Sequence, residues 1–137
     1  FKSMFWWARD FNNGDTPFAS NNPLNFTTSG VTTTEFMFSG ATDFNQNVTT
    51  WDMSSVGSTR GMLAGTGFNH NINSWNVRLY STNMSEMFMS SPFNNGEASG
   101  GTTAPITWTT FNTNDMSNMF YKATNFNQPL IESVFLN

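Results

Sequence analysis

The stretch Met37-Phe38-Ser39-Gly40-Ala41-Thr42-Asp43-Phe44-Asn45-Gln46 decides the fold, because it returns with few changes at Met119 to Gln128. Its opening pair, Met followed by Phe or Leu, recurs through the whole sequence. The five occurrences begin at Met4, Met37, Met62, Met87 and Met119. Their spacings of 33, 25, 25 and 32 residues are typical of stacked repeats. We therefore expect residues 1–137 to form a single repeat-solenoid domain whose units start near these methionines.

The apolar spacing inside each unit changes halfway. The first half has helical spacing, with the positions Met37, Phe38, Ala41 and Phe44 forming one apolar stripe. The second half alternates, as in Trp75, Val77 and Leu79, and this predicts a short strand. The Phe-Asn step between the halves predicts a turn, since Asn tolerates positive φ. The expected fold class is an α/β repeat solenoid, with one short parallel strand and one short helix per coil of about 25 residues.

Two polar inserts lengthen the first and fourth units. They span residues 13–23 and 95–105, and each runs from Phe-Asn-Asn-Gly to Pro-Leu or Pro-Ile. Both inserts occur at the same position within the repeat. We therefore expect one edge of the solenoid to present two protruding loops.

Several strings in the repeat resemble a known family. They are the two Met-Phe-x-x-Ala-x-x-Phe-Asn-Gln strings at Met37 and Met119, Trp-Asp-Met-Ser-Ser-Val at Trp51, and Asn-Met-Ser-x-Met-Phe at Asn83. This set is similar to the BspA-like surface-protein repeat of mycoplasma-type lipoproteins, other bacteria and some protists, which is related to leucine-rich repeats. The resemblance implies leucine-rich-repeat-like coils, a cell-surface or secreted location and a role in adhesion, with no catalytic residues to transfer.

Composition excludes several function classes. The chain has a net charge of −4 and only five Lys and Arg residues, spread along the sequence, so we expect no binding to nucleic acid or anionic membrane and no membrane insertion in this segment. Asn, Ser and Thr make up 54 of the 137 residues, which suits an extracellular or cell-surface protein. The absence of cysteine excludes a disulfide framework but leaves secretion open.

Catalytic and metal-binding patterns are missing from the sequence. His70 is the only histidine, and it occupies a turn position that holds Gln46 or Gln128 in other units, so we interpret it as a polar spacer. The carboxylates form no paired motif, and no calcium loop, zinc spacing or phosphate-binding glycine pattern is present. We therefore expect no enzyme activity, no catalytic residues, no metal site and no cofactor.

Three acceptor patterns for N-glycosylation occur, at Asn25, Asn47 and Asn83. Chance also explains such patterns in a sequence rich in Asn, Ser and Thr. Glycans are therefore candidate covalent attachments and candidate ligands of this protein.

Both ends of the sequence are apolar and lack a polar capping unit. The chain is therefore either an excerpt of a longer protein or a subunit that stacks head to tail on copies of itself. The candidate interface residues are Phe1, Met4, Phe5, Trp6, Trp7, Leu130, Ile131, Val134, Phe135 and Leu136. Trp6 and Trp7 either cover an open end of the stack or stack on sugar rings.

Two functions remain. The leading one is an extracellular structural repeat protein that self-associates end to end into a fibre or surface layer, with glycosylation as an option. The alternative is an adhesion module that binds a host protein or glycan through a solenoid face and the insert loops.

Overall fold

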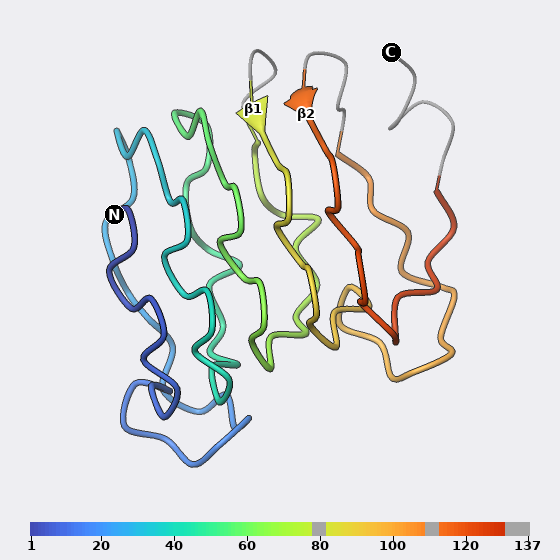
Figure 1. Ribbon diagram of the computed structural model, residues 1–137, viewed down its shortest axis with the longest axis horizontal. Coiled ribbons are helices and arrows are strands. Elements are labelled where there is room, and N and C mark those ends of the chain that lie inside the picture. Colours follow the sequence, from blue (N-terminus) through green and yellow to red (C-terminus); the bar gives the residue numbers. More distant parts are fainter. Residues whose placement is uncertain (78–81, 109–112, 131–137) are drawn as a thin grey trace.

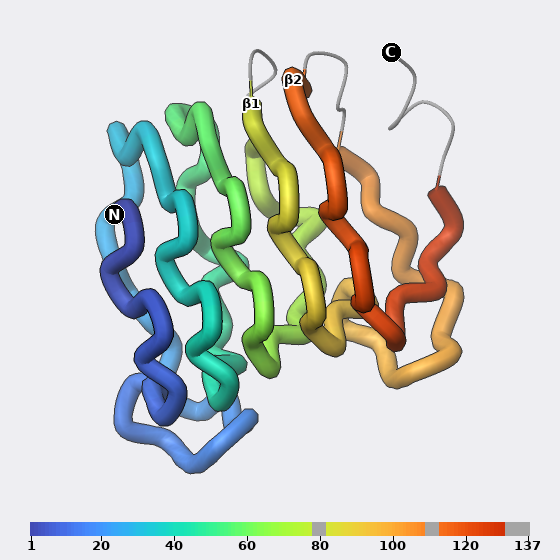
Figure 2. Tube along the Cα trace, in the orientation of Figure 1, coloured from blue at the N-terminus to red at the C-terminus, as the bar shows by residue number. Residues whose placement is uncertain are grey.

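The computed structural model describes residues 1–77, 82–108 and 113–130. The backbone runs through successive coils that lie side by side, from the N-terminal coil at one end to the coil of Met119 at the other (Figures 1 and 2). We number the coils by their Met pairs. Their described residues are 1–31 for coil 1, 32–56 for coil 2, 57–77 for coil 3, 82–108 for coil 4 and 113–130 for coil 5.

Regular secondary structure is sparse. The described residues contain no helix and two short strands, β1 (Thr82–Asn83) and β2 (Thr113–Asp115), which pair in parallel (Figure 1). Isolated parallel bridges continue this pairing from Ser58 to Thr33 on one side and to Asn83 on the other. The prediction of an α/β solenoid with one helix and one strand per coil was therefore wrong. The pairing segments also precede each Met, whereas the alternation of Trp75 and Val77 had predicted a strand in the second half of the unit.

Left-handed backbone explains the missing helices. In every coil the residue before the Met and the residue three positions after it have φ between 51° and 76°. These residues are Ser3, Trp7, Phe36, Gly40, Gly61, Gly65, Glu86, Ser90, Asn118 and Lys122. A right-handed helix cannot continue through such residues, because each left-handed L-residue costs about 1 to 2 kcal/mol and reverses the local turn.

Hydrogen bonds between coils offset this cost. Phe36, Phe38 and Gly40 direct their N–H groups at carbonyls of coil 3, with N···O distances of 2.8, 3.0 and 2.8 Å. Bonds of this kind hold neighbouring chains about 4.8 Å apart, as in a β-sheet. An α-helix is about 10 Å wide with its side chains and does not fit that spacing. The stretch therefore folds into consecutive tight turns.

The core nevertheless contains the side chains that the helical spacing selected. Met37, Phe38, Ala41 and Phe44 are all fully buried. Within coils, rings stack in pairs such as Phe38 on Phe44, with centroids 4.0 Å apart. Between coils, one aromatic column runs through the whole stack at centroid distances of 6.0 to 6.4 Å. Its members are Phe11, Phe44, Phe68, Phe93 and Phe126.

Tryptophans join the coils on the other side of the core. The indole Nε1–H of Trp51 donates to the Leu24 carbonyl at 2.8 Å, and Trp75 repeats this bond to Val48 at 2.9 Å. Trp108 does the same to Ile72 at 2.9 Å. Each buried indole thus bonds to the preceding coil, which satisfies its polar atom and fixes the spacing of the stack.

Candidate assembly interface

An asparagine ladder connects all five coils. The Asn that follows the core Phe accepts, through Oδ1, a hydrogen bond from the backbone N–H of the equivalent Asn in the next coil. The four N···O distances, from Asn45 to Asn12, Asn69 to Asn45, Asn94 to Asn69 and Asn127 to Asn94, are 3.0, 2.9, 2.8 and 2.9 Å. The sequence had suggested only a turn here. The repeated Phe-Asn step in all five units was the signal for the ladder.

Most backbone hydrogen bonds between the coils run in one direction around the Met-Phe pair, although the N–H groups of Asp43, Gly57 and Asn83 donate from a later coil to an earlier one. In each pair of neighbours, N–H groups of the earlier coil donate to carbonyls of the later coil. Coil 4 shows the pattern, with Glu86 donating to Ser117 at 2.9 Å and Phe88 donating to Met119 at 3.0 Å. The two end coils consequently expose opposite groups.

The outer face of coil 1 presents acceptors. The carbonyls of Lys2, Met4 and Trp6 occupy the positions that accept from the preceding coil elsewhere, and none of them accepts a hydrogen bond within the described parts of the chain. The N–H of Asn12 is also unpaired there. This coil 1 face therefore combines three backbone acceptors with the N–H groups of Asp10 and Asn12.

The outer face of coil 5 presents the complementary set. The N–H groups of Asn118, Phe120 and Lys122 occupy the donor positions and make no hydrogen bond to any residue that the structure describes. Oδ1 of Asn127, the last member of the ladder, is also free of such a bond in residues 113–130. A shallow apolar hollow lies on the same face. It is lined by Met116, Asn118, Met119, Phe120, Tyr121 and Leu130.

Exposure of the end coils agrees with these open faces. Met4 is 47% exposed, whereas its counterparts Met37, Met62 and Met87 are fully buried. Of the other candidate interface residues, Phe1, Trp6, Trp7 and Leu130 are exposed, and Phe5 is half-buried. Ile131, Val134, Phe135 and Leu136 lie outside the described residues.

The two insert loops lie at the same edge of the stack, at the bottom of Figure 2. A buried glutamine of the next coil holds each loop. Gln46 donates from Nε2 to the carbonyls of Asn12 and Ala19 at 3.1 and 3.0 Å, and its Oε1 accepts from the N–H of Asn22 at 3.0 Å.

Gln128 repeats this arrangement at the second insert. It bonds to the carbonyls of Asn94 and Gly101 and to the N–H of Ala104, at 3.2, 3.0 and 2.8 Å. Both loops are therefore anchored to the body of the stack.

A carboxylate closes each loop from within. Asp15 accepts from the N–H groups of Asn21 and Thr16 at 2.8 and 2.9 Å, and these bonds, led by that from Asn21, lower its pKa. In the second loop Glu97 accepts from both the hydroxyl and the N–H of Thr103, which lowers the pKa of Glu97. Both carboxylates thus have a structural role.

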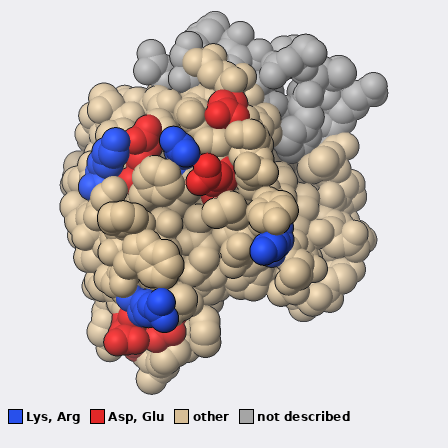
Figure 3. Space-filling view, viewed as in Figure 1, with Lys and Arg blue, Asp and Glu red and all other residues tan. Residues whose placement is uncertain are grey.

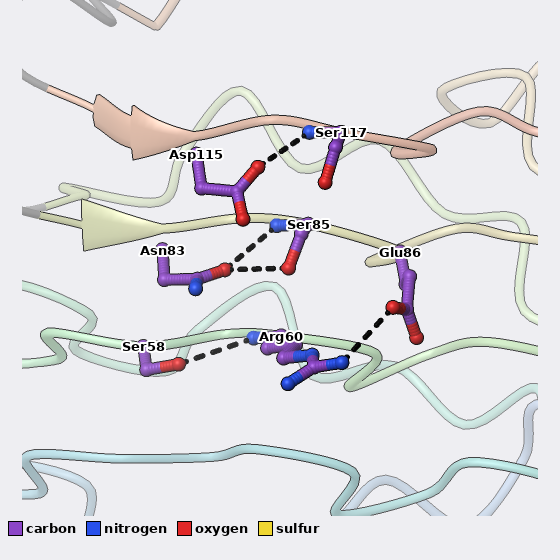
Figure 4. A network of polar contacts seen from close by, with 7 residues as sticks. All are labelled: Ser58, Arg60, Asn83, Ser85, Glu86, Asp115 and Ser117. Atoms are coloured by element: carbon purple, nitrogen blue, oxygen red, sulfur yellow. Dashed lines mark hydrogen bonds and ion pairs between the residues drawn. The ribbon is translucent and has the colours of Figure 1, made fainter.

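A second polar column crosses neighbouring coils at and beside strands β1 and β2 (Figure 4). Ser58, Asn83 and Asp115 each accept a hydrogen bond from the N–H two residues later, at 3.4, 2.9 and 2.8 Å. Thr33 makes the same turn at 3.2 Å. The bond from the Ser117 N–H lowers the pKa of Asp115.

Charges of both signs are interleaved on this face (Figure 3). Lys2 pairs with Glu35 at 2.9 Å, and Arg60 pairs with Glu86 at 3.2 Å. Each pair joins neighbouring coils. The described part of this face therefore presents no strip of uniform charge.

The glycosylation patterns coincide with these local turns. Oδ1 of Asn83 accepts from both the N–H and the hydroxyl of Ser85, and Oδ1 of Asn47 accepts in the same way from Thr49. The turn also forms at Asn71, where no acceptor pattern exists. Asn25 and Asn47 are exposed and Asn83 is half-buried. The turn thus gives Asn47 and Asn83 a structural role that is independent of any glycan.

No geometry for catalysis emerges around the single histidine. His70 Nε2 and the Asn45 carbonyl form a 2.7 Å hydrogen bond, the same contact that Gln46 and Gln128 make to the preceding coil. Within the described ranges, no group of three or more His, Asp or Glu side chains is placed to hold a metal ion. Those ranges also contain no helix with the length and hydropathy needed to span a bilayer.

Comparison with known proteins gives one result. No curated protein and no solved structure matches the chain significantly. The model of the family DUF285, described as a Mycoplasma protein of unknown function, matches residues 1–100, which is most of the chain. This match is consistent with a mycoplasma-type surface repeat family. The protein therefore belongs to the DUF285 family.

Proposed function

We propose that this protein is a non-enzymatic structural repeat protein of the cell surface or extracellular space, and that its copies associate end to end into a fibre or surface layer. The resemblance of its repeat strings to BspA-like surface proteins supports the location. The surface rich in Asn, Ser and Thr suits the same setting. Glycans attached at the exposed Asn25 or Asn47 belong to this proposal.

Apolar exposure on the outer face of coil 1 is the observation that supports self-association most directly, whereas Met119 of coil 5 is 3% exposed. Met4 is 47% exposed although the equivalent methionines of coils 2, 3 and 4 are fully buried. Phe5 and Phe11 are likewise only half-buried on the coil 1 face, as are Phe120 and Phe126 on the coil 5 face. Another coil placed on either face would remove apolar surface from water, and each side chain that becomes fully buried contributes up to about 1.5 to 3 kcal/mol.

Sedimentation velocity over a range of concentrations, with electron microscopy of the same samples, tests this function. The unmodified chain should form elongated particles that grow with concentration. Met4→Glu and Leu130→Glu place a charge on either end face at exposed positions, so both variants should fold and remain monomeric. Thr50→Glu, on the exposed surface of coil 2, is the matched control and should assemble normally.

Two outcomes would contradict the proposal. The first is that the unmodified chain remains monomeric at all concentrations. The second is that Met4→Glu and Leu130→Glu assemble as well as Thr50→Glu does.

A second candidate function is adhesion. Trp6 and Trp7 are each 58% exposed, and Phe18 in the first insert is 57% exposed. Exposed aromatic rings stack on sugars and anchor protein interfaces. Binding of Phe18→Ser and of the unmodified chain to immobilised glycans and matrix proteins tests this function. Equal binding by both proteins would show that the insert loop takes no part in adhesion. Self-association of Phe18→Ser should remain normal.

A further inference from the structure

We propose that the exposed ring of Phe18, in the first insert, is a stacking platform for a neutral oligosaccharide. This proposal rests on the second candidate function, adhesion, and names its ligand class and its site. The contacts that hold Phe18 belong to coils 2 and 3, so the site does not depend on the outer face of either end coil.

The two inserts differ at one left-handed position. Residues 14–24 align with residues 96–106 without a gap. In this alignment Phe18 corresponds to Gly100, and both have positive φ, 63° for Phe18 and 87° for Gly100. Glycine adopts this backbone without strain, whereas a phenylalanine there costs backbone free energy. The first insert therefore holds a large apolar ring at a position where the backbone favours glycine.

Coil 3 lacks a side chain where this ring lies. Gly67 precedes the core Phe68, and a Cβ at Gly67 would overlap the Phe18 ring. The other coils have a side chain at that position, namely Asp10, Asp43, Pro92 and Asn125. Gly67 is buried, whereas Phe18 remains 57% exposed. Backbone thus supports the ring on one side, and much of the ring stays open to solvent.

Two hydrogen bonds to coil 2 fix the backbone of this residue. The Phe18 N–H donates to the Asp43 carbonyl at 2.9 Å, and the Phe18 carbonyl accepts from Nδ2 of Asn45 at 2.8 Å. A ring on an anchored backbone loses little conformational entropy when it binds a ligand. The platform is therefore pre-organised.

Polar side chains of coil 2 lie beside the platform. The Thr42 hydroxyl donates to the Arg9 carbonyl at 3.2 Å and lies 3.5 Å from Oδ1 of Asp43. Oδ2 of Asp43 has no hydrogen-bond or ion-pair partner among the described residues. A carboxylate accepts strong hydrogen bonds from sugar hydroxyls, while the C–H face of a sugar packs on an aromatic ring. Phe18 and Asp43 together supply both kinds of contact.

Charge favours a neutral sugar over an acidic one. The Arg9 guanidinium lies over the Trp7 ring, 5.4 Å from its centroid, and forms no ion pair with Asp43. The Asp43 carboxylate is therefore not neutralised by a cation of the described residues, and it repels an acidic sugar.

A protein partner fits the site less well. Protein interfaces are centred on clusters of buried apolar side chains. The neighbours of Phe18 in the insert are Thr16, Pro17, Ala19 and Ser20, which offer little apolar area.

Binding to immobilised N-acetyllactosamine, chitotriose and mannotriose tests the ligand class. The unmodified chain should bind at least one of these neutral sugars, and it should bind sialyllactose more weakly than that sugar. Phe18→Gly, which installs the residue of the second insert, should weaken binding roughly tenfold or more without lowering the thermal stability. Ser20→Ala, exposed in the same insert, is the matched control and should bind normally.

Further variants separate ring stacking from general apolar contact. Phe18→Trp keeps an aromatic ring and should retain binding, and Trp7 shows that this chain accommodates tryptophan at a φ of 58°. Phe18→Leu keeps an apolar side chain without a ring and should bind as weakly as Phe18→Gly. Asp43→Asn should weaken binding roughly fivefold.

The outcomes distinguish this proposal from the proposed function. Binding of a matrix protein but of none of the three neutral sugars would overturn the ligand class while adhesion stands, and binding of neither would overturn both. Phe18→Gly or Phe18→Leu binding as well as Ser20→Ala would overturn the platform. Tighter binding of sialyllactose would overturn the preference for neutral sugars. Self-association is measured separately, and its failure would leave this proposal intact.

Discussion

Two columns of polar side chains run across the coils, and they differ in where their hydrogen bonds go. Asn12, Asn45, Asn69 and Asn94 form the ladder, whose bonds link each coil to the next. Thr33, Ser58, Asn83 and Asp115 accept bonds from within their own coil and lie nearer to solvent. The difference indicates that the ladder stabilises the stack, whereas the exposed column shapes single turns that water can also satisfy.

The largest effect is expected from the ladder. Asn94 is fully buried, accepts from the Asn127 N–H, and donates from Nδ2 to the carbonyls of Ala98 and Gly101 at 2.8 and 3.1 Å. Asn94→Ala leaves these groups unpaired and should lower the free energy of unfolding by about 3 kcal/mol. Urea unfolding followed by tryptophan fluorescence measures this loss. Asn71→Ala, which removes only an exposed turn bond from the Asn73 N–H, is the control, and equal losses in both variants would refute the special contribution of the buried ladder residue.

A more local effect is expected from the glutamine that anchors the first insert. Gln46→Leu removes the bonds to Asn12, Ala19 and Asn22 and should cost about 2 kcal/mol. Limited proteolysis should then cleave within residues 13–23 sooner than in the natural chain. The insert at 95–105 is held by Gln128 and serves as the internal control. Cleavage that rises equally in both inserts would show general destabilisation.

Tryptophan provides a third kind of bond between coils. Trp75→Phe keeps most of the buried ring but removes the 2.9 Å bond to the Val48 carbonyl. The expected loss in the free energy of unfolding is about 1 to 1.5 kcal/mol. Coil 1 has Phe26 at the corresponding position, and Phe26→Ser, which removes a half-buried ring and no hydrogen bond, compares the two contributions. No measurable loss in Trp75→Phe would mean that water replaces the indole there.

A smaller effect depends on pH. Hydrogen bonds from Lys2 and Ser58 lower the pKa of Glu35 below its ordinary value of 4.5. A carboxylate with a lowered pKa stabilises the folded state above the ordinary value, and this contribution disappears as the pH falls through the lowered pKa. Glu35→Gln should therefore lower the free energy of unfolding by about 0.5 kcal/mol at pH 7 and leave it unchanged at a pH below the lowered pKa of Glu35. Thermal unfolding across this pH range checks it, and a loss independent of pH would argue against the ionised pair.

The smallest effect is expected in the exposed column. Ser58→Ala removes a long 3.4 Å bond from the Arg60 N–H and the hydrogen bond that Ser58 gives to Glu35, and water can replace both. The change in the free energy of unfolding should stay below about 0.5 kcal/mol. Thermal unfolding measures it, and a cost close to that of Asn94→Ala would show that the bridge between Ser58 and its neighbours depends on the side chain.

The sequence predicted the repeat and the buried side chains but not the path of the backbone. Helical spacing specifies which residues point to one side, and Met37, Phe38 and Phe44 are buried as that spacing requires. The same spacing arises here from tight turns with left-handed residues. Glycine occupies these left-handed positions at Gly61 and Gly65, but Trp7 and other residues with side chains occupy them in other coils. The residue type therefore does not predict the left-handed backbone.

Only part of the candidate interface could be predicted from the sequence. Apolar residues such as Met4 and Leu130 were identifiable because they lie in apolar segments that lack a polar capping unit. The carbonyls and N–H groups that lack a partner among the described residues could not be identified, since every residue except proline has both groups and the direction of the coil determines which one faces outward. The Phe-Asn steps of the five coils are visible in the sequence. The sequence alone, however, does not distinguish an Asn that forms a turn from an Asn that bonds to the next coil.

Because the hydrogen bonds between coils in the described residues join immediate neighbours only, those bonds do not share a mechanical load across the stack. A chain held at both termini and pulled would peel from an end, one coil at a time, while the remaining coils stay folded. Each released coil of 25 residues adds about 85 Å of extended chain. The protein would thus lengthen in steps at low force and act as an extensible tether.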